Sequence, residues 1–311
     1  MDLRHLQIFQ HVCRHRSVSA AADELGMSQP ALSKLIRRLE GELGVPLFDR
    51  LPRGLEPTHY AGVLAEAARQ LEANYRGALR QIDSIRDGLG GEVAIGAGAT
   101  WREELLPVAL SRLLARLPGA RFRIETGPNG DALVGALVDG RVDMALAPIV
   151  ARPALDAEIV SETLLVDPLV VACRADHAWV GRDDTTIAEL ATLRWAVARG
   201  ITVLARFRDI FLSHGMEPPQ PTLASEDINC LLDIVASSDL VAYVPQVRVL
   251  ARRSRRLGII RCSAAEKRRA TGVHFRRRSF VSPLARELVA ELRLVLAEKQ
   301  AAAGPGVPAP A

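Results

Sequence analysis

Apolar positions in the first ninety residues recur at intervals of three and four, the spacing that places them on one face of an α-helix. In the first such stretch this face comprises Leu6, Phe9 and Cys13. The second stretch stops at Gly26, because glycine readily adopts the left-handed backbone of a helix end. The spacing predicts helices over residues 3–15, 18–25, 29–40 and about 59–88.

The helix predicted over residues 29–40 has two chemically different faces. Ser28 is its expected N-cap, and a proline in the first turn is tolerated because amides there lack an intrahelical partner. The apolar stripe contains Leu32, Leu35, Ile36 and Leu39. The opposite face carries Gln29, Pro30, Ser33, Lys34 and Arg37. Short polar side chains followed by cations suit entry into a DNA major groove, whereas a solvated helix face is the alternative.

The segment LGVPLFDRLPRGLEPT, residues 43–58, predicts a β-hairpin after this helix. Two short apolar runs flank a turn that carries Arg50 and Arg53 near its tip. Such a hairpin is the wing of a winged helix-turn-helix domain, here residues 1–58. We expect the two arginines to contact phosphates or the minor groove, with simple exposure as the alternative.

The long helix predicted over about 59–88 forms a linker, which we assign to residues 59–90. It carries a sustained heptad pattern. Its apolar residues follow one another at steps of four and three, so the helix is expected to pair with a second copy. The seam comprises Leu64, Ala68, Leu71, Tyr75, Ala78, Ile82 and Ile85. About thirty residues at roughly 1.5 Å each would span about 45 Å, enough to hold two DNA-binding heads apart.

From residue 92 onward, apolar runs of strand length alternate with helical stretches. This alternation predicts an α/β region with parallel sheets wrapped by helices, including one helix over about 102–117. A break near residues 160–166 divides the region 91–300 into two lobes. We assign about 91–162 and 267–300 to lobe I and about 163–266 to lobe II, followed by a disordered tail over 301–311.

Composition narrows the class of protein. The 311 residues are 49% hydrophobic and 24% charged, as in ordinary globular proteins, and the net charge is +4. Residues 1–58 contribute eight basic and seven acidic side chains, so their balance of only +1 does not by itself indicate nucleic-acid binding. Four scattered cysteines fit a reducing compartment, and no apolar run is long enough for a membrane span. We expect a cytoplasmic protein without a cofactor.

Two clusters invite other functions. His11 and His15 lie four residues apart on one helix face, a spacing that suits two ligands of one metal ion. However, Cys13 between them belongs to the apolar face, and no carboxylate follows at a useful spacing. We therefore predict no metal site. A run of arginines could bind nucleic acid, although a solvated helix end is the favoured interpretation because no aromatic residue is interleaved with it. This run comprises Arg248, Arg252, Arg253, Arg255 and Arg256.

The stretch VAIGAGATW, residues 93–101, places two glycines between a strand and a helix, as a dinucleotide fingerprint does. Position 101 is tryptophan where the third glycine would stand, so a dinucleotide site is rejected. Thr100 remains at a predicted helix N-terminus, where free amides favour an anion, and Asn129 and Gly130 precede the next helix in the same way. For Thr100, a plain N-cap is the alternative.

The runs LRHLQIF, residues 3–9, and SVSAAADELGMSQPALSKLIRRLEGELGVPLFDRLPRGLEPTHYAG, residues 17–62, closely resemble the amino-terminal domain of LysR-type transcriptional regulators. The remaining chain resembles the family's two-lobed, periplasmic-binding-protein-like effector domain. The resemblance implies base or backbone contacts from the polar face of residues 29–37 and a wing contact from Arg53. It also implies an effector cleft formed by the loops of Thr100 and Asn129 and by the facing loop with Arg199 and Thr202.

Two hypotheses follow. The first is a regulator of double-stranded promoter DNA, a homodimer assembling into a homotetramer and contacting RNA polymerase, whose effector is a carboxylate metabolite such as an aromatic or sugar acid. Trp101 would supply an apolar wall of the cleft or belong to the core. The second is an enzyme or solute-binding protein on the same two-lobed domain. The sequence has no GxSxG, HExxH or P-loop motif, which argues against the enzyme.

Overall fold

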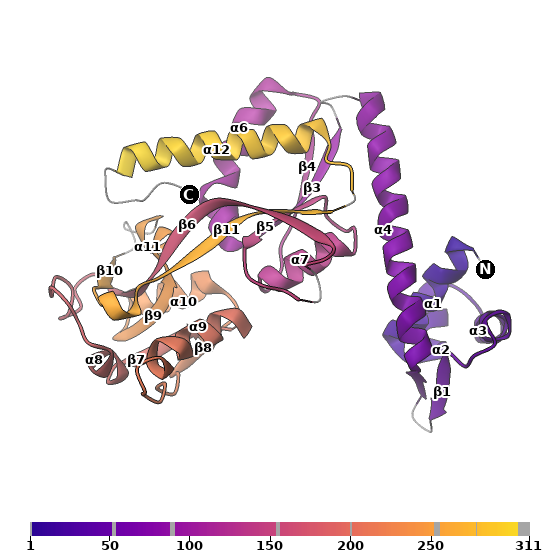
Figure 1. Ribbon diagram of the computed structural model, residues 1–311, viewed down its shortest axis with the longest axis horizontal. Helices are drawn as coiled ribbons and strands as arrows, with labels where there is room; N and C mark the ends of the chain where they lie inside the picture. Colours follow the sequence, from indigo (N-terminus) through magenta and orange to yellow (C-terminus); the bar gives the residue numbers. More distant parts are fainter. Residues whose placement is uncertain are drawn as a thin grey trace. The chain divides into compact units, whose positions relative to one another are not determined.

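The computed structural model describes residues 2–51, 54–87, 91–153, 156–199, 201–251, 256–277 and 279–303. The chain divides into a helical amino-terminal unit and a larger α/β unit (Figure 1). No described helix is both long and apolar enough to cross a membrane.

The amino-terminal unit begins with three helices whose ends are set by local chemistry. They are α1 (Leu3–His15), α2 (Val18–Leu25) and α3 (Gln29–Leu43). Asp2, Ser17 and Ser28 each accept a hydrogen bond from the amide three residues further on, which satisfies a free amide of the first turn. Gly26 and Gly44 end α2 and α3 with left-handed backbone. A shared apolar core holds the helices together and includes Phe9, Val12, Ala21, Leu32, Leu39 and Leu47.

The hairpin consists of β1 (Phe48–Leu51) and β2 (Gly54–Pro57), which pair antiparallel. The amide of Leu55 donates to the carbonyl of Arg16 at 2.9 Å, so the hairpin is fixed to the end of α1. Gly54 is required at this contact because it has a φ of 131° and a Cβ there would lie 2.7 Å from the Arg16 carbonyl oxygen.

Helix α4 (His59–Asp87) is preceded by Thr58, whose hydroxyl accepts from the amide of Ala61. The structure revises the proposed heptad seam. Leu64 packs against the core of the amino-terminal unit and Ala68 is buried, so neither is free for a partner helix. Further along, Leu71 is 52% and Ile82 60% exposed. Tyr75 and Ala78 are exposed as well, and the side chain of Ile85 lies outside the description.

The α/β unit is built on one continuous sheet in the described residues. Its strands run in the order β4-β3-β5-β11-β6-β9-β7-β8, and β10 also pairs with β6. The strands are β3 (Glu92–Ala97), β4 (Arg121–Glu125), β5 (Met144–Pro148), β6 (Ile159–Arg174), β7 (Arg194–Ala198), β8 (Leu223–Ser225), β9 (Leu240–Pro245), β10 (Leu257–Ile260) and β11 (Lys267–Arg276).

The expectation of parallel sheets is confirmed within each lobe but does not extend to the two strands that join the lobes. Strands within each lobe pair in parallel, but β6 and β11 run antiparallel to each other and to their neighbours. These two long strands pass side by side from one lobe into the other (Figure 1). Leu164 on β6 packs in the core of lobe I, whereas Leu169 and Val171 pack in that of lobe II. Gly272 is necessary where the register shifts, because a Cβ there would lie 1.9 Å from the Glu162 carbonyl oxygen.

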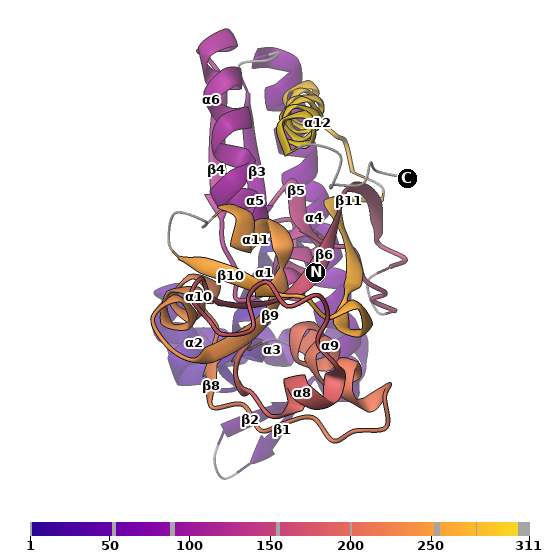
Figure 2. The same cartoon turned by 90° about the vertical axis from the view of Figure 1, so that its left-hand side faces the viewer.

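Helices cover both lobes. They are α5 (Ala99–Glu104), α6 (Leu106–Arg116), α7 (Gly130–Val138), α8 (Ile187–Ala191), α9 (Ile201–Leu212), α10 (Ile228–Ala236), α11 (Gln246–Ala251) and α12 (Pro283–Ala303), with a 3-10 turn at Ser263–Ala265. In lobe I, α12 lies beside α6 (Figure 2), and Arg112 binds Glu298 across the pair at 2.6 Å.

Two helix predictions are corrected. The helix expected over 102–117 is two helices that meet at Leu105, because Pro107 has no amide to continue the hydrogen-bond ladder. The disordered tail expected from residue 301 does not begin there, since α12 continues through the alanines to Ala303 and alanine has the highest helix propensity. Residues 304–311 lie outside the described residues.

Candidate functional site

The first candidate surface is the polar face of α3. Leu32, Ile36 and Leu39 anchor the opposite face in the core, which directs the polar side chains outward. Gln29, Pro30, Lys34 and Arg37 are exposed and Ser33 is half-buried. Arg37 donates from Nε to the carbonyl of Ser33 at 3.3 Å, so its cation lies along the helix.

The sequence predicts a second set of DNA-contacting cations, Arg50 and Arg53, on the hairpin. Arg50 lies on β1, but its side chain is outside the description, and Arg53 lies outside the described residues. The described part of the hairpin ends with the antiparallel pairing of Leu51 with Gly54.

A cavity of about 490 Å³ lies between the two lobes of the α/β unit. It is lined largely by residues at or just beyond the carboxyl ends of β3, β4, β5, β7, β8 and β9, where ligands of open α/β sheets bind. The structure brings together four of the residues singled out in the sequence at this cavity, Thr100, Asn129, Gly130 and Arg199, and Trp101 also contacts it. Thr202 lies on α9, but its side chain is outside the description.

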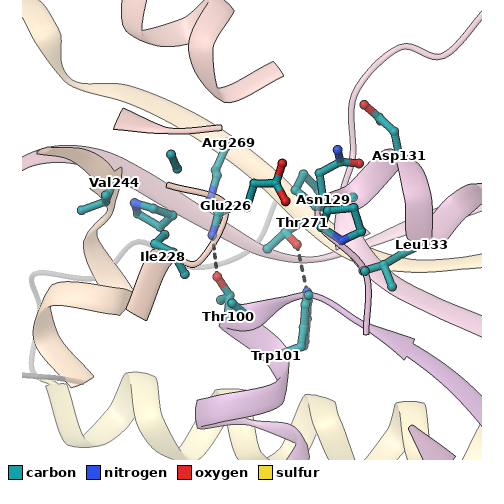
Figure 3. A pocket seen from close by; sticks show the side chains of 18 of the residues that line it. Thr100, Trp101, Asn129, Asp131, Leu133, Glu226, Ile228, Val244, Arg269 and Thr271 are labelled. Atoms are coloured by element: carbon teal, nitrogen blue, oxygen red, sulfur yellow. Dashed lines mark hydrogen bonds between the residues drawn. The ribbon is translucent and has the colours of Figure 1, made fainter. Parts of the chain in front are cut away.

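Thr100 is held by a buried arginine rather than by a cap interaction (Figure 3). Arg269 on β11 donates from Nη2 to Thr100 Oγ1 at 2.9 Å and to Asp167 Oδ2 at 3.1 Å. Burial raises the pKa of Asp167, and the charge of Arg269 opposes that rise. Because Thr100 accepts from Arg269, its own hydroxyl proton remains free to donate to a ligand.

The two N-cap expectations have different outcomes. Gly98, not Thr100, is the N-cap of α5, so the alternative of a plain cap at Thr100 is wrong. The helix has only six residues, which leaves little dipole to attract an anion there. Asn129 does cap α7, because its Oδ1 accepts from the amide of Ala132 at 2.9 Å. Gly130 is needed beside it, since a Cβ would lie 2.9 Å from Pro148 Cδ.

The two aromatic residues of the cavity wall belong mainly to the lobe cores. Trp101 is buried in the core of lobe I, and its Nε1 donates to Thr271 Oγ1 at 2.9 Å (Figure 3). Tyr243 packs in the core of lobe II and donates its hydroxyl to the carbonyl of Ala265 at 2.5 Å. Both polar groups are therefore occupied within the protein.

The charged groups of the cavity divide into paired and unpaired sets. Arg152 is buried and donates from Nε to Asp131 Oδ1 at 2.8 Å. Within the described part of the chain, no carboxylate pairs with Arg199 or with the half-buried Arg206. Burial lowers the pKa of Arg206, which means that its charge is incompletely solvated. Glu226 is exposed, points toward the cavity in Figure 3, and has no cation partner among the described side chains.

A second polar network crosses between the lobes beside the cavity. Arg248 on α11 is 1% exposed and donates to Glu103 Oε2 on α5 at 2.5 Å and to the carbonyl of Ala99 at 3.2 Å. Asn229 on α10 accepts from Arg248 and donates to Glu103 Oε1 at 2.7 Å. The interpretation of Arg248 as part of a solvated arginine run is therefore wrong, because helix α11 turns it inward toward lobe I.

Of the other four arginines in that run, the structure describes one. Arg256 is exposed with a φ of 64°, and Arg252, Arg253 and Arg255 lie outside the described residues.

Sequence reasoning missed Arg269, Arg206 and Asp167. A signal for Arg269 was present, because it alternates with Thr271 and Val273 on one face of a strand, and an inward arginine needs a buried partner. The partner was equally visible as the single acid in the apolar run LLVDPLVVAC. Arg206 gave a weaker signal, since it flanks the buried Phe207 and Ile210 on α9.

Comparison with known families accounts for nearly the whole chain. Residues 3–62 match the model of the bacterial regulatory helix-turn-helix protein, lysR family. Residues 86–297 match the LysR substrate binding domain. Both models describe parts of DNA-binding transcriptional regulators rather than enzymes.

Among curated relatives, the HTH-type transcriptional regulator GbpR of Azospirillum brasilense is 30% identical over 78% of this chain and 70% of its own length. The SDS degradation transcriptional activation protein of a Pseudomonas species is 33% identical over 78% of this chain and 79% of its own. The fold is similar to that of a full-length OxyR variant from Pseudomonas aeruginosa (TM-score 0.64, 23% identity, 94% of this chain and 95% of that one). It is also similar to CbnR in complex with its target DNA (TM-score 0.63, 21% identity, 95% and 100%).

Proposed function

Because the chain belongs to the LysR family of DNA-binding transcriptional regulators, we propose that a small anionic metabolite bound in the cavity between its lobes modulates its contact with promoter DNA. The observation that carries this proposal is the half-buried Arg206 at the cavity wall, which lacks a carboxylate partner among the described residues. A carboxylate ligand would compensate the charge with a strong, ion-assisted hydrogen bond.

Two neighbouring groups support a carboxylate. Arg199, exposed at the same cavity, adds a second cation that no described acid neutralises. Thr100 can donate its hydroxyl proton, because Arg269 already occupies it as an acceptor. Cations and a hydroxyl donor converge on one cavity, which favours an anion over a neutral apolar molecule.

The same cavity also favours a ligand with hydrogen-bond donors. Glu226 would repel a simple anion, but it would accept hydrogen bonds from hydroxyl groups on the rest of the ligand. The aromatic walls are limited to Trp101 and Tyr243, which pack mainly in the two cores. We infer a hydroxylated carboxylate, such as a sugar acid, in preference to an aromatic acid.

Calorimetry tests this ligand class with a panel of sugar acids, aromatic acids and the neutral sugars that correspond to the acids. Arg206→Gln should lower the affinity for a sugar acid by about tenfold or more, since a hydrogen bond between charged groups contributes roughly 1.5–3 kcal/mol. Arg208→Gln is the matched control, because Arg208 is exposed on the same helix and does not line the cavity. Equal binding of acids and neutral sugars, or equal loss in both variants, would contradict the proposal.

For DNA, we propose that the amino end of α3 enters the major groove. Gln29 and Ser33 would contact base edges, with Ser28 and Pro30 close to the backbone, while Lys34 and Arg37 would contact phosphates. This assignment is supported by the outward direction and exposure of the polar face of α3. Arg50 and Arg53 of the hairpin would contact phosphates or the minor groove beside it.

For assembly, we propose that α4 pairs with α4 of a second copy and that two dimers form a tetramer that contacts RNA polymerase. The support for the dimer is the exposed apolar row on α4. Action on promoter DNA implies that the protein works in the cytoplasm.

A further inference from the structure

A cluster on the amino-terminal unit joins two histidines and one carboxylate. Helix α1 places His11 and His15 one turn apart on the same face, and α2 brings Glu24 between them. Glu24 Oε1 lies 3.2 Å from His11 Nδ1, and Oε2 contacts His15 Nε2. One ligand atom from each residue lies within 4.8 Å of the others.

We propose that His11, His15 and Glu24 form a binding site for a divalent transition-metal ion, with Zn²⁺ as its simplest occupant. Two imidazole nitrogens and one carboxylate oxygen are a donor set that Zn²⁺ accepts, and a water molecule would complete four-coordination. Bonds of about 2.0–2.2 Å in tetrahedral geometry separate ligand atoms by about 3.4 Å. The separation of His11 Nδ1 from Glu24 Oε1 is close to that value.

A second observation points to a ligand at this place. His11 Nδ1 is buried, and none of the described groups forms a hydrogen bond with it although Glu24 Oε1 is 3.2 Å away. Buried nitrogen atoms of this kind normally have a partner. A metal ion between His11 and Glu24 would satisfy both atoms at once.

Neighbouring groups define how the site would work. Cys13 lies between the two histidines in sequence, but it packs against the core and does not belong to the cluster, so it would not supply a ligand. The nearby charge of Arg14 would weaken the binding of a cation. His15 and Glu24 are partly exposed, which gives a metal ion access from solvent.

The expected consequence of metal binding is a more stable amino-terminal unit. A metal ion would tie α1 to α2, which in turn packs against α3, the helix with the proposed DNA-binding face. Binding to the folded state alone raises stability by mass action. Zn²⁺ should therefore raise the melting temperature of the protein.

The test uses the untagged full-length protein, freed of metal by a chelator and titrated with Zn²⁺ alone by calorimetry. We expect one ion per chain in the micromolar range and an increase in Tm. His15→Ala and Glu24→Gln should each weaken binding at least tenfold. His5→Ala, on the same helix but outside the cluster, should bind as the unchanged protein does.

Co²⁺ provides an independent measurement, because tetrahedral Co²⁺ absorbs visible light strongly. The unchanged protein should develop this absorption and Glu24→Gln should lose most of it. Circular dichroism establishes that each variant is folded, and Glu24→Gln serves if His15→Ala does not fold. The absence of saturable binding, or equal binding by Glu24→Gln and the unchanged protein, would overturn the proposal.

Discussion

The proposed DNA contacts of α3 are of two kinds, contacts with base edges and contacts with phosphates. Gln29 is exposed in the first turn, where an amide can bond a base edge, whereas Lys34 is an exposed point charge one turn further along. Gln29→Ala should therefore reduce the preference for the operator over random DNA by about 1–3 kcal/mol. Lys34→Ala should weaken binding to both and lower the slope of log affinity against log salt by about one.

Competitive gel shifts at several salt concentrations measure both effects. Arg38→Ala is a suitable control, because Arg38 is exposed on the same helix but pairs with Glu42 at 2.8 Å. Equal loss for operator and random DNA in Gln29→Ala would refute the base contact, and an unchanged salt slope in Lys34→Ala would refute the phosphate contact.

His274 makes lobe I sensitive to acid. Burial lowers the pKa of His274 to about 4, with the charge of Arg152 as a further cause. The neutral ring fits its site, since Nδ1 lies 2.7 Å from Ser161 Oγ and Nε2 3.3 Å from the Ala147 carbonyl. Between about pH 6.5 and 4 the unfolded chain binds a proton here that the folded chain does not, so stability falls as pH falls through this window.

We expect His274→Gln to be less stable than the unchanged protein at pH 7.5 but to lose less stability on acidification. The histidine contributes up to about 3 kcal/mol to this pH dependence. Urea unfolding at pH 7.5 and 5.0 measures the difference. If both proteins lose the same free energy of unfolding between these two pH values, another group is responsible.

At the scale of elements, α4 carries the prediction about assembly. Leu71 is 52% exposed in the single chain, so Leu71→Glu should leave the monomer folded. In a paired helix the same change places a charge in the apolar seam of each copy, which should dissociate the dimer and abolish binding to paired half-sites.

Gln70→Glu adds the same charge to the neighbouring residue, which is exposed and lies outside the seam. Sedimentation should therefore show the unchanged oligomer for Gln70→Glu and a smaller species for Leu71→Glu. If the two variants sediment alike, α4 does not form the interface.

At the scale of the whole α/β unit, the two lobes are joined by the network of Arg248, Glu103 and Asn229. Glu103→Gln leaves the buried Arg248 without its charge partner, which should lower the free energy of unfolding by about 3 kcal/mol. Asp239→Asn is the control, because it removes a more exposed pair with Arg174 and should change stability by less than about 1 kcal/mol. Urea unfolding compares them, and equal effects would show that the network does not join the lobes energetically.

The local structure of the chain could be predicted from short stretches of sequence. Helix periodicity, the cap at Ser28 and the stop at Gly26 predicted α1 to α3, because these signals act within a few residues. The motifs of residues 3–62 likewise indicated the family, since they lie close together along the chain. The alternation of strands and helices predicted the α/β class of the larger unit.

The contacts between residues far apart in the chain became known only from the folded structure. Arg269 and Asp167 are 102 residues apart, and Arg248 reaches Glu103 across 145 residues, so no local pattern identifies these pairs. Glu24 joins His11 and His15 only because α2 folds back against α1. The antiparallel pairing of β6 with β11 was not predicted either, since periodicity indicates the length and burial of a strand but not the direction of its neighbour.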